Sequence, residues 1–419
     1  MQLNHRKTCR VCNSSTLNKV IDLGEQYLQG SFIKPDKKMP PDQRFPTSLV
    51  HCNPTKNNNA CGLLQMEHTV PPEVLYSVYW YRSGTNNTMR KHLQSIAHEG
   101  TLIIRKSKAL VLDIGCNDGT LLNSYPKEFQ KFGIDPSDIA QEVKGDITVI
   151  QDIFPSDKLI QKLNGRKFDV ITSIAMFYDL ENPIEFTKNI KNILAPNGLW
   201  IFEMSYMPTM LEMNSYDTIC HEHLEYYSLS VIEYILKQAG MRIYNTSLNS
   251  INGGSIRCYA THSSNFIYDK DEFSNNIKVL IQKEKNLELD TDKPYKIFQD
   301  HVNIHKTGLN SLLRKLKNEG KKIHIYGAST KGNTILQWCE IDNKIIDVAA
   351  ERNPDKYGAH TLGTNIPIVS EAESRAMNPD YYLVLPWHFK EEFIEREKET
   401  LDKGIGLIFP LPEIEIIKR

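Results

Sequence analysis

The most constraining feature of this sequence is a short buried strand that runs directly into a glycine-rich turn. Residues 111–122 read VLDIGCNDGTLL, an apolar run followed by Gly115, Gly119 and the start of a helix. Such a turn lets a ligand lie against backbone at the carboxyl end of a parallel sheet. It is not a GxGxxG fingerprint, because Asn117 and Thr120 stand where glycines are needed, and no Gly-Lys-Ser/Thr follows to make a P-loop.

Apolar runs alternate with longer mixed segments after this point, which predicts βαβ units in a mostly parallel sheet. The expected strands are Ala109–Ile114, Gly133–Asp135, Thr148–Ile150, Asp169–Ile174 and Leu199–Glu203, followed by an antiparallel pair at Met241–Ser247 and Ser255–His262. Residues 71–100 predict two helical pieces joined by a turn at Arg82-Ser83-Gly84. A second α/β series begins at Lys322–Tyr326.

Four of the eight cysteines gather near the N-terminus: Cys9, Cys12, Cys52 and Cys61. In a reducing compartment such a cluster is more often a metal site than a pair of disulfides. Four thiolates close a tetrahedral zinc shell and leave no open position, so the expected role of the metal is structural. The second pair is more widely spaced than usual, and four free thiols in a loop-rich module are the alternative.

The charge of the chain is balanced, with 50 Lys and Arg against 51 Asp and Glu and no block of like charge. This balance excludes the broad positive field of a nucleic-acid or anionic-membrane binder. No apolar run approaches the ~20 residues that span a bilayer, and the stretch MQLNHRKTCRVC has no signal-peptide core. We therefore expect a cytoplasmic protein with neither a nucleic acid nor a membrane as partner.

An acid follows the second expected strand at Asp135, and another follows the third at Asp152. With the DxGxxxG turn, this pattern resembles class I S-adenosylmethionine-dependent methyltransferases. The resemblance implies S-adenosylmethionine as cofactor, with Asp135 on its ribose hydroxyls and Asp152 or Ile153 beside its adenine. The cofactor-binding residues expected by resemblance are Asp113, Gly115, Asn117, Gly119, Asp135, Asp152 and Ile153.

Residues 215–228, SYDTICHEHLEYYS, place two imidazoles and a carboxylate among tyrosines. His221-Glu222-His223 is not HExxH, so the two histidines do not have the i, i+4 spacing of a zinc protease. A neutral imidazole beside a carboxylate instead predicts a pair that abstracts a proton. The alternative is a hydrogen-bonded polar turn that caps a helix.

Over nearly all 419 residues the chain resembles the sugar-nucleotide C-methyltransferases that methylate 4-keto deoxysugars. The four-cysteine module, DIGCNDG, DTICHEHLEYYS, NGGSIR and YGASTKGNT carry the resemblance, in that order. It implies an α/β protein with a class I methyltransferase (Rossmann-like) core. The expected parts are a zinc-binding domain (1–70), the core with a helical lead-in (71–265), a helical linker (266–320) and a Rossmann-like α/β domain (321–419).

The resemblance also implies the chemistry. A base removes the hydrogen at C3, beside the C4 ketone of a nucleoside-diphosphate sugar, and the resulting enolate attacks the methyl group of S-adenosylmethionine. By resemblance His223 is the base, Glu222 orients it or shares its role, and Tyr79 or Tyr81 faces the sugar. His221 and Tyr178 complete the expected catalytic set, and Lys331, Asn252 and Tyr226 are the expected substrate-binding residues.

The chain departs from the best-known relatives at two places on the substrate side. Cys220 stands where they have a tyrosine before His-Glu-His, and residues 175–179, AMFYD, stand where they have a histidine. The sugar and the carbon that is methylated are therefore open, and Tyr178 is a candidate for steadying the enolate. Methylation at C5 or on an oxygen is one alternative, and a non-catalytic zinc-containing scaffold is another.

Two features of the C-terminal part have two interpretations each. Lys331, in the GASTKGNT turn, either meets a diphosphate or belongs to a purely structural turn. Trp387-His388-Phe389 either lines the cleft or packs in a core. Because the charge is balanced, a diphosphate has to be met by a few placed groups such as Lys331, Arg82 or Arg257.

Overall fold

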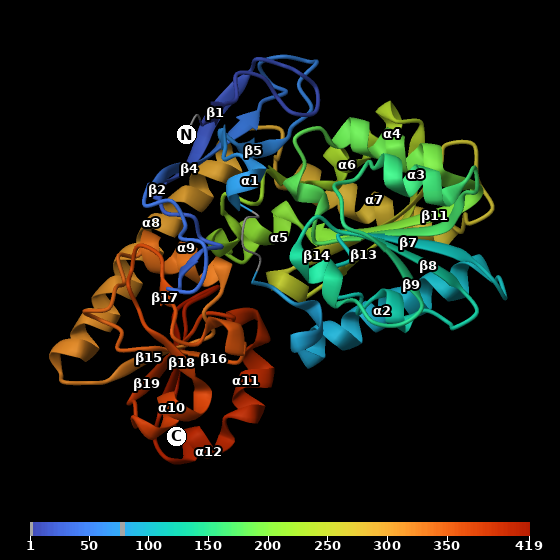
Figure 1. The fold of residues 1–419 in the computed structure, drawn as a ribbon. Helices are drawn as coiled ribbons and strands as arrows, with labels where there is room; N and C mark the ends of the chain where they lie inside the picture. Colours follow the sequence, from blue (N-terminus) through green and yellow to red (C-terminus); the bar gives the residue numbers. More distant parts are fainter. Residues whose placement is uncertain (1–2, 76–79) are drawn as a thin grey trace.

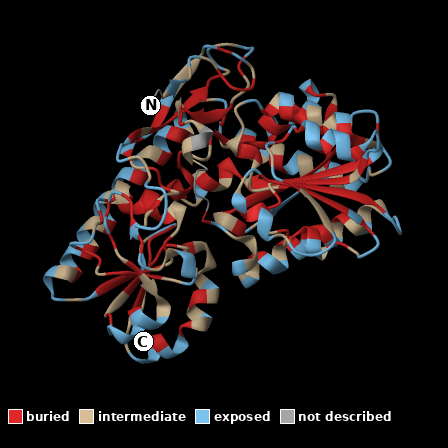
Figure 2. Ribbon diagram, in the orientation of Figure 1, coloured by how far each residue is buried: buried red, intermediate tan, exposed pale blue. Residues whose placement is uncertain are grey.

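The computed structural model describes residues 3–75 and 80–419. They form an N-terminal module, a central α/β unit and a C-terminal α/β unit (Figure 1). The strands of both large sheets are mostly buried, and helices with an exposed outer face cover them (Figure 2). Among the residues described, no helix is long and apolar enough to cross a membrane.

The central unit is a seven-stranded sheet in the order β13-β14-β11-β10-β7-β8-β9. All neighbours from β9 to β11 are parallel, and β14 runs antiparallel to both of its neighbours. This is the class I methyltransferase arrangement, and it confirms the expected strands and the antiparallel pair. The strands are β7 Leu110–Ile114, β8 Gln130–Ile134, β9 Ile147–Ile150, β10 Phe168–Ile174, β11 Leu194–Ser205, β13 Met241–Asn249 and β14 Ser255–His262.

Helices cover both faces of this sheet, as Figure 1 shows for α2, α4 and α6. In α2 the buried residues Met89, Leu93, Ile96 and Gly100 recur at helical spacing, and Asn86 caps its start by accepting hydrogen bonds from the next turn. The helices are α1 Pro72–Leu75, α2 Asn87–Ile104, α3 Asp157–Leu163, α4 Pro183–Ile193, α5 Met207–Glu212, α6 Leu229–Gln238 and α7 Asp271–Asn286.

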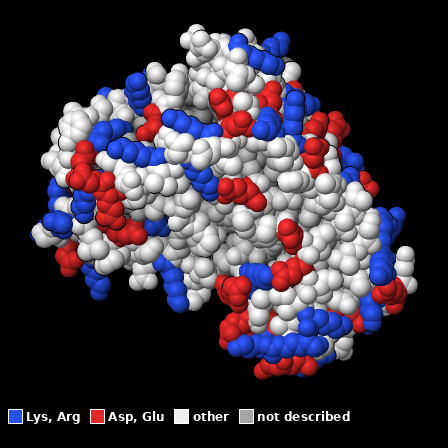
Figure 3. Space-filling view, turned by 180° about the vertical axis from the view of Figure 1, so that it is seen from behind, with Lys and Arg blue, Asp and Glu red and all other residues white. Residues whose placement is uncertain are grey.

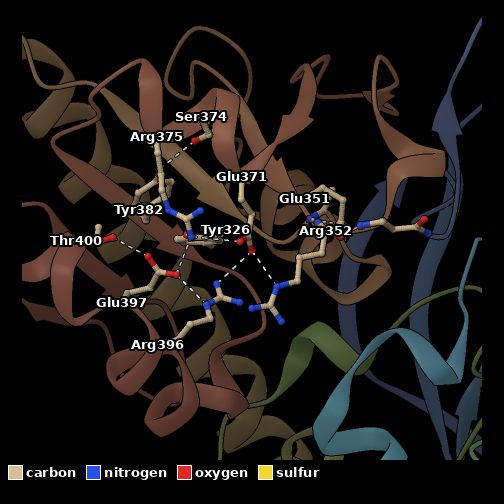
Figure 4. Close-up of polar contacts among 12 residues, drawn as sticks. Tyr326, Glu351, Arg352, Glu371, Ser374, Arg375, Tyr382, Arg396, Glu397 and Thr400 are labelled. Atoms are coloured by element: carbon tan, nitrogen blue, oxygen red, sulfur yellow. Dashed lines mark hydrogen bonds and ion pairs between the residues drawn. The ribbon is translucent and has the colours of Figure 1, made fainter.

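The C-terminal unit is a six-stranded sheet in the order β18-β16-β15-β19-β20-β21, parallel except for β21. Its strands are β15 Ile323–Tyr326, β16 Ala349–Glu351, β18 Ile368–Ser370, β19 Tyr381–Val384, β20 Gly406–Phe409 and β21 Glu415–Ile417, and its helices are α9 Thr330–Trp338, α10 Glu371–Ala376, α11 Lys390–Arg396 and α12 Lys398–Asp402. Arg375 and Arg396 each pair with Glu371 and Glu397 around Tyr326 (Figure 4). These ion pairs tie α10 to α11.

The N-terminal module is a small antiparallel sheet whose order is β12-β5-β4-β2. Its strand β12 (Glu225–Tyr226) comes from the middle of the chain and pairs with β5. A second pairing joins β3 to β17 of the C-terminal unit. The module is therefore joined by strand pairing to both other parts. The remaining strands are β1 Asn4–His5, β2 Leu17–Gln26, β3 Phe32–Ile33, β4 Phe45–Cys52, β5 Leu64–Met66, β6 His68–Thr69 and β17 His360–Thr361.

The segment expected as a helical linker consists of two packed helices. Helix α7 packs on β13 of the central sheet. Helix α8 (Lys293–Asn318) buries a stripe that includes Phe298, Val302, Leu309 and Leu313. This stripe shares one hydrophobic core with the N-terminal module and the C-terminal sheet. The two helices thus belong to different cores.

Candidate active site

The cofactor side of the site begins at the turn after β7. Gly115 and Gly119 have φ of 75° and 76°, and Asn117 has a φ of 48°. These left-handed conformations favour glycine and asparagine, which explains why the turn has this composition. The Asn117 backbone N–H donates to Asp135 Oδ2 over 2.9 Å. The turn after β7 is thereby tied to the end of β8.

Asp135 fits the ribose role that the sequence predicts. Its Oδ1 accepts from Ser137 N and Ser137 Oγ over 2.8 Å and 2.6 Å, and its Oδ2 accepts from Asn117 N. A carboxylate has about four acceptor positions, so Oδ2 keeps one for a ligand hydroxyl. The acceptor position that stays free on Asp135 therefore fits S-adenosylmethionine, whose ribose hydroxyls can donate a hydrogen bond to it.

The other acids expected on this side have different surroundings. Asp113 is buried and accepts from Thr172 Oγ1 over 2.6 Å, and burial raises its pKa to about 7. Asp152 lies at the surface, where it accepts from Ile153 N and Ser156 Oγ. The Ile153 side chain is 65 % exposed, which leaves an apolar group available to cover an adenine. The roles of Asp152 and Ile153 remain predictions.

The segment from residue 80 to 85 closes over the cofactor turn. Ser83 N donates to Asn117 Oδ1, and Asn117 Nδ2 donates to the backbone oxygen of Tyr81. Tyr81 is 48 % exposed, although burial and the nearby charge of Asp118 raise its pKa to about 12. Tyr79, its expected companion, lies outside the described residues.

His223 belongs to a second group of side chains, here called the acceptor side, which includes Tyr178 and Lys331. Its Nδ1 is 2.8 Å from the Thr218 backbone oxygen, and a carbonyl oxygen can only accept. Nδ1 therefore carries the hydrogen, and Nε2 keeps a free lone pair. Burial and the charge of Lys331 lower the pKa of His223 to about 3, which keeps the imidazole neutral. The Tyr178 ring packs against it with centroids 4.2 Å apart.

Glu222 lies next to the N-terminal module. Burial raises its pKa, and the backbone of Gly30 and the side chain of Cys220 hydrogen-bond to it. A Cβ added to Gly30 would come 2.0 Å from Glu222 Oε1. His223 Nδ1 donates the hydrogen bond that orients its ring, and the Thr218 oxygen accepts it. The role expected for Glu222, to orient His223 or to share its role, stays a prediction.

Three further titratable groups interact electrostatically with Glu222 or Lys331. They are Asp179, Asp217 and His388. Burial raises the pKa of both carboxyl groups and lowers that of His388 to about 3. Asp217 Oδ2 accepts from Trp387 Nε1 over 2.9 Å. Trp387 is buried, as the core-packing interpretation expects, and the cleft-lining interpretation of this segment stays a prediction.

Buried polar atoms without partners concentrate here. Within residues 3–75 and 80–419, the atoms that lack a hydrogen-bond partner include Asp179 Oδ1, Asp217 Oδ1, Glu222 Oε2 and His388 Nδ1. Each such atom costs roughly 1–3 kcal/mol if nothing binds it. A cluster of them around a neutral histidine is what a polar ligand would satisfy.

Lys331 lies near Asp217 and the two histidines, because its charge acts on the pKa of each. Its Nζ donates to the Asn252 backbone oxygen over 2.6 Å, and burial lowers its pKa. The other two cations expected to meet a diphosphate are held elsewhere. Arg82 pairs with Glu142 and Asp355, and Arg257 pairs with Glu203 and Glu99.

Two expected site residues belong to the N-terminal module instead. His221 is buried with its Nε2 3.1 Å from Thr47 Oγ1 of β4. Tyr226 is part of β12, and its hydroxyl donates to the Thr218 oxygen over 3.4 Å. Their expected catalytic and substrate-binding roles stay predictions. The cavity of about 490 Å³ lined by Arg10 and Lys188 lies elsewhere and includes none of the groups around His223.

The four expected zinc ligands lie together. The Sγ atoms of Cys9, Cys12, Cys52 and Cys61 are all within 4.8 Å of one another. Four sulfurs at this spacing fit a tetrahedral zinc ion. The wide spacing of the second pair is taken up by a polar loop, in which Asn53 Oδ1 accepts from Thr55 N over 2.8 Å. The four thiols form a closed set, which indicates a structural metal.

Three family models match consecutive parts of the chain. A model described as "Putative zinc binding domain" matches residues 9–76, a methyltransferase domain matches residues 81–246, and a C-methyltransferase C-terminal domain matches residues 250–412. The cysteine cluster falls within the first match, whereas the methyltransferase match ends inside β13 and leaves β14 of the central sheet to the C-terminal match.

The chain is 26% identical over 422 residues to the C-methyltransferase NovU of Streptomyces niveus, which covers 98% of this chain and 96% of NovU. A solved methyltransferase from Clostridium acetobutylicum is 17% identical over 42% of this chain and 92% of its own, with a TM-score of 0.33. Magnesium protoporphyrin IX methyltransferase from Synechocystis, solved with SAH bound, is 17% identical over 42% of this chain and 88% of its own, with a TM-score of 0.33.

The order of the three domain matches and the whole-length similarity to NovU agree with the sheet topology and the four-cysteine cluster. The chain is an S-adenosylmethionine-dependent C-methyltransferase with an N-terminal zinc-binding domain.

Proposed function

We propose that the protein methylates C3 of a 4-keto-6-deoxy sugar nucleotide, through an enolate that forms when His223 removes a proton. The observation that carries this proposal is the neutral imidazole of His223, whose Nε2 lone pair stands among buried polar atoms without partners. Methylation of carbon needs a carbanion equivalent, and a base beside an acidic C–H supplies one.

The chain's own residues account for the proton transfer. Thr218 holds the imidazole in the tautomer that accepts a proton at Nε2. Proton transfer turns a neutral imidazole and a neutral ketone into an imidazolium and an enolate, so the net charge of the site does not change. A histidine with a pKa lowered to about 3 can therefore act as a base when the anion forms beside it. S-adenosylmethionine supplies an electrophilic methyl group when it is bound.

The surroundings favour a sugar as the acceptor. The unpaired atoms of Asp179, Asp217, Glu222 and His388 are suited to hydroxyl groups, which both donate and accept hydrogen bonds. A substrate with several hydroxyls satisfies such a set better than an apolar one. This argument supports the sugar implied by the resemblance.

The nucleotide is proposed to lie at the carboxyl ends of β15 and β16. Parallel α/β sheets bind ligands at this edge, where Glu351 accepts from Ala328 N over 3.0 Å. The edge adjoins the segment that covers the cofactor turn, because Asn353 Nδ2 donates to the Trp80 oxygen. Positive and negative side chains are intermingled on the face seen in Figure 3, which favours recognition of the diphosphate by a few placed groups.

A cytoplasmic location is part of the proposal. Four cysteines that are to bind zinc have to stay reduced, and the cytoplasm keeps thiols in that state. The same cysteines are without disulfide bonds in this structure.

Deuterium exchange tests the proposed function. The enzyme is incubated with a 4-keto-6-deoxy sugar nucleotide in deuterated water without S-adenosylmethionine. We expect exchange at C3 in the wild type, loss of that exchange in His223→Ala, and full exchange in His98→Ala, whose side chain is exposed on α2. With the donor added, a methyl group should appear on C3.

Two results would overturn the assignment. Undiminished exchange in both His223→Ala and Glu222→Gln would remove the enolate mechanism from this segment. A product methylated on oxygen, or on C5, would support the corresponding alternative instead.

A further inference from the structure

An enolate needs a partner for the charge on its oxygen. When the proton leaves C3, the negative charge passes to the C4 oxygen, and a donor that is already in place there stabilises the transition state. The inference below rests on the proposed function and concerns which residue supplies that donor.

Lys331 is placed for this role by helix α9. It stands in the first turn of the helix, whose start is capped by Ser329 Oγ accepting from Gly332 N over 3.0 Å. The ammonium group has three N–H donors. One of them donates to the Asn252 backbone oxygen over 2.6 Å. The other two donors remain for a ligand.

The charge of Lys331 acts on the groups around the expected acceptor. It contributes to the lowered pKa of both His223 and His388, and it counteracts the raised pKa of Asp217. Since such effects fall off with distance, the ammonium group lies near these groups. The backbone agrees, because a Cβ on Gly30 would lie 2.0 Å from Glu222 Oε1 and 3.6 Å from Oγ1 of Thr330, the residue before Lys331. Asp217 in turn favours the charged form of Lys331 against the cost of burial.

These neighbours fit an enolate better than a diphosphate. Asp217 interacts with Lys331, Asp179 interacts with Glu222, and burial raises the pKa of all three carboxyl groups. A diphosphate would bring two negative charges among them. An enolate brings one charge, which forms only when His223 becomes positive.

We propose that Lys331 is a catalytic residue whose ammonium group donates a hydrogen bond to the C4 oxygen of the substrate and stabilises the enolate. The C3–H bond breaks, its proton goes to His223 Nε2, and its electron pair forms the C3–C4 double bond as charge moves to the oxygen. C3 then bonds to the methyl carbon, the sulfur–methyl bond breaks, and its electron pair stays on sulfur. The carbonyl re-forms, and His223 releases its proton to water.

Asp217 and Trp387 act on Lys331 as positioning residues. Trp387 Nε1 donates to Asp217 Oδ2 over 2.9 Å, which fixes the carboxyl group opposite the ammonium group. Trp387 comes from the C-terminal unit and Asp217 from the segment that precedes His223. The docking of the C-terminal unit thereby sets the position of the donor relative to the base.

The test measures donor-free deuterium exchange at C3 in Lys331→Met, which keeps the length of the side chain without its donors. We expect exchange to fall by about 10²–10³-fold, the loss typical for removing one such donor. Binding of thymidine diphosphate and of uridine diphosphate, used as probes, should change by less than about threefold. Lys344→Met, at an exposed lysine of the same unit, should match the wild type in both measurements.

The pH profile separates a catalytic role from a structural one. Because Lys331 lowers the pKa of His223, its removal raises that pKa. The acid limb of the exchange rate should therefore move to higher pH in Lys331→Met, toward the value of about 6.5 for an ordinary histidine. Lys331→Arg keeps the charge and should leave the acid limb of the exchange rate near its wild-type pH. If Lys331→Met does not fold, Lys331→Arg is the variant to measure.

Each outcome bears on the proposal. Exchange at the wild-type rate in Lys331→Met, or slower exchange with an unmoved acid limb, would overturn it. A loss of diphosphate binding with normal exchange of bound substrate would assign Lys331 to the diphosphate instead. Absence of exchange in the wild type would count against the proposed function itself, which distinguishes that failure from a failure at Lys331.

Discussion

The two sides of the active site are built in opposite ways. The cofactor side comes from one continuous stretch, residues 111–153, in which the turn after β7 is tied to Asp135 by short-range hydrogen bonds. The acceptor side joins Gly30 of the N-terminal module, His223 of the central segment and Lys331 of the C-terminal unit. Donor binding should therefore depend on the central unit alone, and proton abstraction on the assembly of all three parts.

The hydrophobic cores follow the same division only in part. One core joins β2, β4 and β5 of the N-terminal module to α8 and the C-terminal sheet. Another joins the region of Cys9 and Cys52 to the central sheet. The N-terminal module thus packs against both α/β units, which explains how it can hold the acceptor side together. The following variants test this division, beginning with the largest expected effect.

Loss of zinc should have the largest effect. Cys52→Ser removes one ligand of a closed four-thiol set, and structural zinc contributes on the order of 10 kcal/mol to the folding of such modules. The β12–β5 and β3–β17 pairings depend on the module, so methylation should be lost while S-adenosylmethionine still binds. Metal analysis, thermal melting and donor titration check this. Cys258→Ser, outside the cluster, should keep its zinc, and one full equivalent of zinc in Cys52→Ser would refute the ligand set.

Gly30→Ala should damage the acceptor side without disturbing the donor. The new Cβ would come 2.0 Å from Glu222 Oε1, so the carboxyl group has to move. A displacement of this size at a reacting centre costs on the order of 10²-fold in rate. Methyl transfer and zinc content are measured together. The control is Gly308→Ala, where the added Cβ meets only the Ile414 side chain at 3.3 Å. Equal rates of methyl transfer in the two variants would show that the position of Glu222 does not affect the reaction.

Asp135→Asn should weaken donor binding by about ten- to a hundredfold, since hydrogen bonds to charged groups contribute about 1.5–3 kcal/mol. Asp152→Asn should weaken it less, because Asp152 lies at the surface. Titration calorimetry with S-adenosylmethionine ranks the two. The matched control is Asp138→Asn, the next acid along the chain from Asp135. An Asp152 effect larger than that of Asp135 would reverse the predicted assignment of the two acids.

Arg82→Ala should have the smallest effect. Arg82 links Glu142 of the central unit to Asp355 of the C-terminal unit, but exposed ion pairs contribute only about 0–1 kcal/mol. We expect a melting temperature within a few degrees of the wild type and KM values changed by less than about threefold. A rise in the KM of the sugar nucleotide of more than about tenfold would instead assign Arg82 to binding of the diphosphate.

The same division explains which parts could be predicted from the sequence. The strand, the glycine turn and the acid at 135 form a local pattern, and the parallel sheet and the four-cysteine cluster were predicted from spacing alone. His223 was also predicted, from residue type and resemblance. Gly30 and Asp217 carry no local signal, because their importance comes from partners far along the chain.

Other features could not be predicted for a related physical reason. The oxygen that orients His223 is a backbone carbonyl of Thr218, and every residue has one, so no residue type marks it. The strand β12 is two residues long and pairs with β5, more than 150 positions earlier. The contact between His221 Nε2 and Thr47 Oγ1 likewise depends on that distant sheet, and the catalytic role expected for His221 stays a prediction.

Donor-free deuterium exchange, measured in Gly30→Ala and Asp135→Asn side by side, tests the division most directly. The account predicts exchange at least about tenfold slower in Gly30→Ala, where the surroundings of the base are disturbed. It predicts exchange within about twofold of the wild type in Asp135→Asn, because no donor takes part in that step. Equal loss in both variants, or a loss confined to Asp135→Asn, would contradict the claim that the acceptor side is assembled separately from the cofactor side.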